Sequence, residues 1–343
     1  MMSIDWLMEN GGPVVRYRTQ VELLNCYKNN LSEVYLGDVL AMPQVQKRLT
    51  LLKNLDYNKV HGSNSTYLEN VLPMLVDVGL HYEIDAFRNE VLSAFDISKI
   101  ALINEYDKII GYPFLLQSGF PVTGMLEYVI ERIKTIYDFT KNMDFAIYDN
   151  AENYKSVPKT FRDRPIIKPE IAYGNMCRLP LIYDIVAFAK IYDKVSSDMQ
   201  MQIDNIINYI ISPGYDVVVD VYGILVAPSR RYYSMGWDCK KPFNDNQNYS
   251  HQNIHRLLLY SHFPTAVKST WFQNAIDYLM QFKSSNGTYV FPKNYLIEVD
   301  GYWVLGSRMS LAENRRSKRY LEVESSFYMQ KLLTAQQTHT YYP

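Results

Sequence analysis

The sequence has little net charge and few cysteines. Its 343 residues include 35 Lys and Arg against 36 Asp and Glu, which gives a formal net charge of −1. Such a balance argues against non-specific binding to nucleic acid or to an acidic membrane surface. The three cysteines, Cys26, Cys177 and Cys239, are odd in number and far apart. They therefore indicate reduced thiols in a cytoplasm rather than a disulfide framework.

Long apolar runs are also missing. No run approaches the ~20 residues that a membrane-spanning helix needs. The first residues, MMSIDWLMENGG, lack the basic start and the apolar stretch of a signal peptide, so we expect none. The sequence thus predicts a cytoplasmic protein without a membrane span. A hydrophobic share of 48% is typical of a globular chain with a sizeable core.

Apolar residues recur at helical spacing along most of the chain. Residues 121–140 have one apolar face, which predicts a helix with one solvent face, whereas residues 179–194 are apolar nearly all round, which predicts a buried inner helix. The expected helices are residues 4–9, 17–27, 43–55, 66–78, 85–95, 121–140, 179–194, 197–211, 251–263, 267–283 and 320–333. They form antiparallel pairs at intervals of roughly 40–50 residues, the range of helical repeat units.

Three stretches lack this periodicity and are expected to be extended: residues 144–148, 217–226 and 295–305. In the last, Asp300-Gly301 predicts a hairpin turn between residues 297–299 and 302–304. No change of composition marks a domain boundary. We therefore predict one all-α domain, residues 1–343, folded as an α/α toroid.

The expected toroid is an (α/α)6-like barrel of antiparallel helix pairs with a few short β-hairpin elements in loops. Its central cavity would be closed at one end by residues 212–250 and 284–319. The 30 tyrosines suit an aromatic-lined cavity, because each supplies apolar area with a polar tip, but they equally suit plain packing between helices.

Several motifs resemble a known group of proteins. They are Trp6-Leu7, GPVVRYRT at residues 12–19, His61, the helix end at residues 72–79, SSNG before Tyr289, GYWV at residues 301–304, ENRR at residues 313–316 and ESSF at residues 324–327. Together they are similar to bacterial proteins with a prenyltransferase-like or squalene-cyclase-like α/α toroid. The resemblance implies that fold over most of the chain, and it implies no settled activity.

The sequence departs from the enzymes of that superfamily. The Asp-x-Asp-Asp acid of class II terpene cyclases and the Asp-Asp-x-x-Asp magnesium motif of class I enzymes are absent, and Asp216 and Asp220 are the nearest match. Protein prenyltransferases place zinc on an aspartate, on a cysteine two residues later and on a distant histidine. Here Asp238 and Cys239 are adjacent. We therefore expect no cofactor.

Arginines and aromatic residues gather in three loops. Guanidinium groups bind carboxylates or phosphates through two parallel hydrogen bonds and also stack on rings. The alternative is that these arginines pair with helix ends in structural loops. The expected ligand-binding residues are Arg162, Arg164, Arg230, Arg231, Tyr232, Tyr233, Trp237, Trp303, Arg308, Arg315 and Arg316. We expect Arg230 or Arg231 to face the same end of the cavity as Arg315 or Arg316.

His61, Asp238 and Glu313 are the candidate catalytic residues. His61 precedes a helix, and the unperturbed pKa of histidine suits acid–base work near neutral pH. A weaker hypothesis is a zinc set of Asp238, Cys239, His251 and His255, because the two histidines lie one helical turn apart. The glutamate of a His-Glu-x-x-His motif is missing, so we expect no metal, and the pair also fits a polar helix start.

Three functions remain open from the sequence. The first is the binding or conversion of a small ligand in the cavity, isoprenoid-like with an anionic head. The second is a carbohydrate-active (α/α)6 enzyme that uses paired carboxylates. The third is a non-catalytic binding or scaffold protein. The expected partner is a small molecule, with no nucleic acid and no membrane span, and the oligomeric state stays open.

Overall fold

The computed structural model describes residues 4–24, 30–92, 95–100, 104–154, 157–172, 177–218, 221–227, 231–243 and 251–341. The chain divides into two compact units. Unit 1 comprises residues 1–122 and 242–343, and unit 2 comprises residues 123–241. Among the described residues the fold is mostly helical, with one small four-stranded sheet, so the prediction of a mainly helical protein is confirmed.

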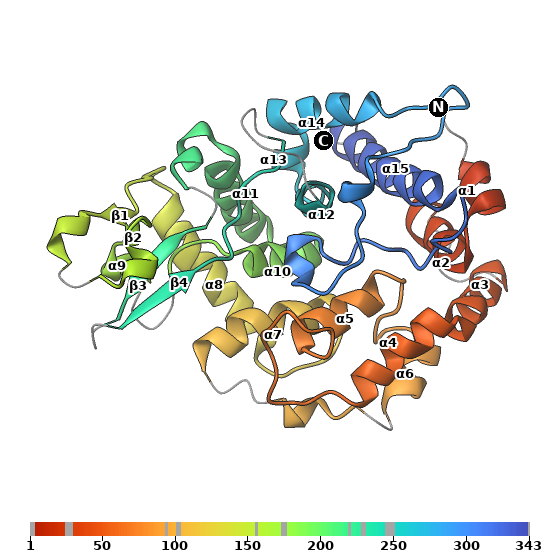
Figure 1. The fold of residues 1–343 in the computed structure, drawn as a ribbon, viewed down its shortest axis with the longest axis horizontal. Helices are drawn as coiled ribbons and strands as arrows, with labels where there is room; N and C mark the ends of the chain where they lie inside the picture. Colours follow the sequence, from red (N-terminus) through yellow and green to blue (C-terminus); the bar gives the residue numbers. More distant parts are fainter. Residues whose placement is uncertain are drawn as a thin grey trace. The chain divides into compact units, whose positions relative to one another are not determined.

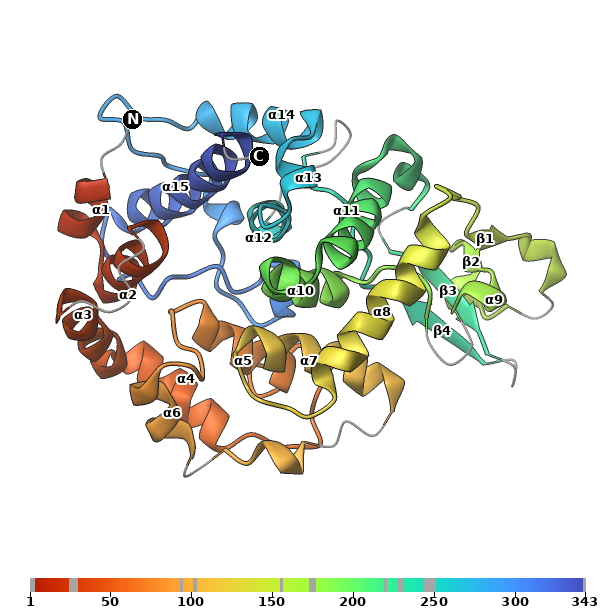
Figure 2. The same ribbon diagram turned by 180° about the vertical axis from the view of Figure 1, so that it is seen from behind.

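Unit 1 contains eleven α-helices in its described residues. They are α1 (Ile4–Asn10), α2 (Pro13–Arg18), α3 (Asn30–Ala41), α4 (Pro43–Lys53), α5 (Leu68–Val76), α6 (Asp85–Leu92), α7 (Glu105–Gln117), α12 (His251–Tyr260), α13 (Pro264–Val267), α14 (Thr270–Met280) and α15 (Tyr320–Tyr341). The long helix α15 packs against α1 and α2 from the start of the chain and against α12, α13 and α14 (Figures 1 and 2). The two ends of the chain therefore share one core.

Local sequence explains where several of these helices begin. Pro43 occupies the first turn of α4, where its missing N–H leaves no hydrogen bond unmade. The side chain of Ser269 caps α14 by accepting from the N–H of Phe272. The helix expected at residues 267–283 therefore begins only at Thr270, and the short helix α13 lies between it and the helix expected at residues 251–263.

Other helices differ from the prediction. The expected helix at residues 17–27 begins earlier, as α2, and then widens into a π-helical turn at Thr19–Leu23. Helix α7 was not predicted, and Pro113 lies inside it, where proline removes a helical hydrogen bond. Packing of α7 against α5 outweighs that loss.

Unit 2 combines four helices with the sheet. Its helices are α8 (Met125–Thr140), α9 (Pro169–Ala172), α10 (Ile182–Ile191) and α11 (Ser197–Ile211). Helix α10 is buried from Ile182 to Phe188, and α8 keeps one exposed side, as predicted for both. Helices α8 and α11 pack side by side (Figure 1).

The sheet is mixed and runs in the order β1-β2-β3-β4. Its strands are β1 (Tyr148–Asp149), β2 (Ile166–Ile167), β3 (Gly223–Val226) and β4 (Tyr232–Met235). The outer pairs are antiparallel, whereas β2 and β3 are parallel. The antiparallel pair β3–β4 fits the expectation of short hairpins in loops. The four-stranded sheet was not predicted, because long-range pairing joins three separate stretches.

The hairpin at residues 297–309 is wider than predicted. Its arms are held by hydrogen bonds from Val299 N to Ser307 O and from Met309 N to Ile297 O. The predicted second arm, residues 302–304, instead begins the 3-10 turn Trp303–Leu305, which ends at Gly306 with a φ of 70°. Glycine adopts this left-handed conformation at no steric cost.

No helix in the described part of the chain is both long and apolar enough to cross a membrane.

Candidate functional site

The tip of the hairpin at residues 297–309 lies on α5 in unit 1. The backbone N–H of Trp303 donates to Oδ1 of Asn70 at 2.9 Å, and its indole Nε1 donates to Oδ2 of Asp77 at 2.5 Å. The indole ring also meets His255 edge-on, with 4.3 Å between centroids. Asn70, Asp77 and His255 thus hold Trp303 in place, and Trp303 attaches the hairpin to α5.

His61 lies beside a buried carboxylate. Its Nδ1 is 2.6 Å from Oε1 of Glu69, whose side chain is fully buried, while about a third of the His61 side chain (32%) is exposed. The imidazole stacks on the ring of Tyr302 from the hairpin tip, with 5.2 Å between centroids. Burial and the Glu69 charge raise the pKa of Tyr302 above its usual range.

The loop that holds His61 is tied down at several points. The N–H of Gly62 donates to Oε1 of Glu69 at 2.5 Å, and the amide of Asn70 donates to the carbonyls of Gly62 and Asn64. A Cβ at Gly62 would lie 2.5 Å from the ring of Tyr67. A fixed loop and a buried carboxylate together set the direction of the imidazole.

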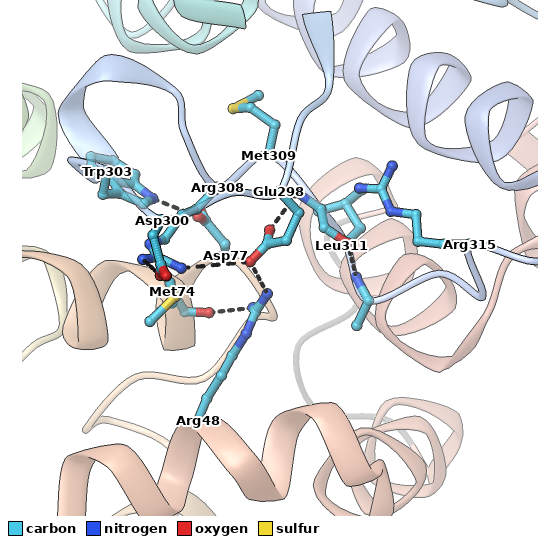
Figure 3. Close-up of polar contacts among 12 residues, drawn as sticks. Arg48, Met74, Asp77, Glu298, Asp300, Trp303, Arg308, Met309, Leu311 and Arg315 are labelled. Atoms are coloured by element: carbon cyan, nitrogen blue, oxygen red, sulfur yellow. Dashed lines mark hydrogen bonds and ion pairs between the residues drawn. The ribbon is translucent and has the colours of Figure 1, made fainter. Parts of the chain in front are cut away.

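Two buried arginines face each other across a carboxylate at the other end of α5. Arg48 extends from α4 and Arg308 from the hairpin, and a guanidinium nitrogen of each lies 3.9 Å from Oε1 of Glu298 (Figure 3). Arg48 also donates to the carbonyl of Met74 at 2.7 Å, and Arg308 donates to Oδ1 of Asp300 at 2.9 Å. This group is called the Arg48–Arg308 cluster below.

A second charged group adjoins this end of α5. Arg18 from α2 donates to the carbonyl of Asp77 and pairs with Glu22, which also pairs with Lys331. Burial raises the pKa of Asp77 to about 6, although Arg18 and the Trp303 hydrogen bond lower it. Arg18 and Lys331 hold the pKa of Glu22 at about 2 against the effect of burial. Cations here are largely matched by carboxylates.

Glu313 and Arg315 meet other elements of unit 1. Oε1 of Glu313 accepts from the N–H of Gly12 at 2.6 Å, and burial raises its pKa. Arg315 lies 3.1 Å from Oε2 of the fully buried Glu324, and its guanidinium stacks over Tyr320. Burial raises the pKa of Glu324 to about 7, although Arg315 lowers it. Arg316 is exposed, so the arginine-rich loop is only partly turned inward.

In unit 2, the basic and aromatic candidates lie at the outer part of the sheet. Arg164 donates to the hydroxyl of Ser234 on β4 at 2.8 Å, and Tyr232 stacks against Phe161. Four of the predicted ligand-binding residues described in this unit are exposed: Arg162, Arg164, Arg231 and Tyr233. Arg230 lies outside the described residues.

Trp237, Asp238 and Cys239 form the inner end of that loop. Trp237 has a φ of 65°, and its carbonyl accepts from the N–H of Ile182 at the start of α10. Asp238 and Cys239 are both buried. Asp238 accepts from its neighbour Lys240, and the Cys239 thiol lies 3.3 Å from the carbonyl of Pro180. These residues belong to the packing of unit 2.

The zinc set is divided between the units. His255 lies in unit 1, Asp238 and Cys239 lie in unit 2, and the side chain of His251 is outside the description. Within the described residues, no three His, Cys, Asp or Glu side chains gather as metal ligands. The expectation that Arg230 or Arg231 faces the same end of the cavity as Arg315 or Arg316 likewise involves both units and stays a prediction.

Sequence analysis missed the residues that surround these candidates. Arg48 could have been noticed, because it falls on the buried stripe of α4 formed by Val45, Leu49 and Leu52. Glu69 sits in a helix that is buried from Leu68 to Leu75, which is unusual for a charged residue. Asp77 and Glu298 carry no comparable signal.

No family model, curated protein or solved structure matches this chain.

Proposed function

We propose that this protein binds a small ligand and converts it by proton transfer, with His61 as the group that exchanges the proton. The observation that carries the proposal is the 2.6 Å contact between His61 Nδ1 and the buried Glu69 carboxylate. A carboxylate at one ring nitrogen orients an imidazole and fixes its tautomer, so that the opposite nitrogen can act as base and then as acid. Glu69 is the positioning residue.

Burial supports this role for Glu69. An unpaired buried carboxylate is costly, and Glu69 is paired with His61 and accepts from the N–H of Gly62. The Nδ1 atom is buried, so the exposed third of the His61 side chain lies on its other ring atoms. This is the arrangement that a group exchanging protons with a ligand requires.

In its wider form, the proposal places the ligand in the central cavity of an α/α toroid of the prenyltransferase-like group. The ligand is then isoprenoid-like with an anionic head, and the protein is cytoplasmic. Its support is the resemblance of the sequence motifs, the helical fold and the buried arginines of unit 1.

Hydrogen exchange with solvent tests the proton transfer without knowledge of the complete reaction. Isoprenoid aldehydes, isoprenoid diphosphates and small 2-oxo acids are each incubated with the protein in D2O, and loss of C–H signals is followed by proton NMR. At least one compound should exchange faster with the wild type than with His61→Gln, by roughly 100-fold or more. If no compound distinguishes the two proteins, the proposal fails, and a non-catalytic binding protein is favoured.

Glu69→Gln separates positioning from simple packing. The Gln side chain keeps an oxygen for the Gly62 N–H but loses the charge, so exchange should fall by at least about tenfold. Nitrogen-15 NMR of labelled histidine should show fewer His61 side chains with the proton on Nδ1. A variant with unchanged exchange and an unchanged spectrum would reduce Glu69 to a structural residue.

A carbohydrate-active enzyme is the second candidate, favoured by the raised pKa values of Glu313 and Glu324 around Arg315. A carboxylic acid with a raised pKa serves as the proton donor in glycoside hydrolysis. The test is hydrolysis of p-nitrophenyl glycosides by the wild type, Glu313→Gln and Glu324→Gln. Hydrolysis that both substitutions abolish, with His61→Gln fully active, would select this function instead.

A further inference from the structure

The Arg48–Arg308 cluster leaves hydrogen-bonding capacity unused. Both side chains are at least nine-tenths buried, with 10% and 6% exposed. The buried Nε of Arg308 has no hydrogen-bond partner among the described residues. Buried polar groups normally find a partner, because an unsatisfied one loses its hydration without replacement. This unused donor points to a group that binds here.

Glu298 compensates the charge of the two arginines without bonding to them well. One guanidinium nitrogen of each arginine lies 3.9 Å from Oε1 of Glu298. This distance exceeds the roughly 2.7–3.2 Å of a protein hydrogen bond. The other oxygen, Oε2, accepts from the N–H of Ser310 at 3.3 Å. The carboxylate thus neutralises two buried cations from a distance.

Glu298 is also the more exposed partner. Its side chain is 34% exposed, several times more than either arginine. A rotation of this side chain toward solvent moves its charge away and breaks its 3.3 Å hydrogen bond from the N–H of Ser310. The backbone ladder of the hairpin does not involve this side chain. Two guanidinium groups would then face one remaining carboxylate of the cluster, that of Asp300. Asp77, near Arg48, is already engaged by Trp303 and Arg18.

We infer that Arg48 and Arg308 bind the carboxylate of a small organic acid, and that Glu298 occupies this position until the ligand displaces it. A carboxylate fits the planar fork of a guanidinium with two parallel hydrogen bonds, and the resident group is itself a carboxylate. The inference deepens the proposed function by naming the class of ligand, but its test measures binding alone.

The test is isothermal titration calorimetry with succinate as the carboxylate and inorganic phosphate as the comparison. Glu298→Gln keeps the size of the side chain and removes the competing charge, so it should bind succinate about tenfold more tightly than the wild type. Arg308→Lys keeps the charge but loses the fork, so it should bind at least about tenfold more weakly. Phosphate should bind more weakly than succinate to Glu298→Gln.

Arg319→Gln is the matched control, because Arg319 is an exposed arginine of the same unit, and its affinity should stay within about twofold of the wild type. Misfolding of Arg308→Lys cannot imitate the gain expected for Glu298→Gln. Equal or weaker succinate binding by Glu298→Gln overturns the inference, as does phosphate binding more tightly than succinate. If the D2O experiment shows no His61-dependent exchange but succinate binds as expected, only the proposed function is refuted.

Discussion

The indole Nε1 of Trp303 donates a hydrogen bond to Oδ2 of Asp77 at 2.5 Å. This contact joins a hairpin near the end of the chain to the residue that follows α5, 226 positions earlier. The same end of α5 carries the Arg48–Arg308 cluster, and the other end carries His61 and Glu69. One short helix and one hairpin tip therefore position both groups in unit 1.

Asp77→Asn should change how stability depends on pH. Burial raises the pKa of Asp77 from 3.8 to about 6, so the folded state binds more protons than the unfolded state between these values. The wild type should therefore lose stability relative to the variant as pH rises from 4 to 6, by about 1.4 kcal/mol for each unit of the shift. Urea unfolding at several pH values measures this difference. With the exposed Glu9→Gln as control, a pH-independent difference for Asp77→Asn would contradict the prediction.

Gly62→Ala should destabilise unit 1. The added Cβ would lie 2.5 Å from the Tyr67 ring, and overpacking of this kind costs about 1–3 kcal/mol. Gly37→Ala is the control, because Gly37 lies in α3 with nothing within 4 Å of its Cβ position; it should stabilise by roughly 0.5–1 kcal/mol. Chemical denaturation measures the free energy of unfolding of both variants. If Gly62→Ala loses no more stability than Gly37→Ala, the close packing of Gly62 against Tyr67 is contradicted.

Arg132→Met should strongly destabilise unit 2. Arg132 on α8 donates two hydrogen bonds to Asp184, and both side chains are buried. Removing one partner leaves a buried charge uncompensated, at about 3–5 kcal/mol. The double variant Arg132→Met/Asp184→Asn should recover much of this loss. The control is Lys134→Met, at an exposed position of the same helix, which should change stability by no more than about 0.5 kcal/mol. If Arg132→Met destabilises the protein no more than Lys134→Met does, the prediction is refuted.

Thiol titration should find three reactive cysteines after denaturation. Cys177 and Cys239 are buried cysteines that form no disulfide among the described residues, whereas Cys26 lies outside the described residues. In the native protein, Cys239 should react only as fast as the protein opens, because its side chain is inaccessible. The measurement is the release of thionitrobenzoate with and without denaturant. A count of one under denaturing conditions would indicate a disulfide.

Helices with strong local signals were predictable. The apolar periodicity of α8, the nearly continuous apolar composition of α10 and the serine cap of α11 are all local properties. The sheet and α7 were not predictable in the same way. Strand β2 pairs with β3 across more than fifty residues of intervening chain, and such pairing leaves no periodic signal in two residues.

The candidate site was predictable only in part. His61 and Arg308 stand out by residue type, whereas Glu69, Arg48 and Glu298 become relevant through their neighbours. Arg315 also stands out by residue type and was expected to bind a ligand. In the structure its partner is the buried carboxylate of Glu324. Residue type indicates what chemistry a side chain can perform, and only its surroundings indicate which partner it has.

The sequence by itself determined the helical class of this protein, the absence of large net charge and the kinds of side chain available for chemistry. These follow from composition and from contacts between residues close along the chain. Tertiary structure alone decided that the hairpin tip rests on α5, that Glu69 lies behind His61 and that Glu298 stands between two buried arginines. The physical reason is that burial and ion pairing depend on distances in space, which packing of distant segments sets.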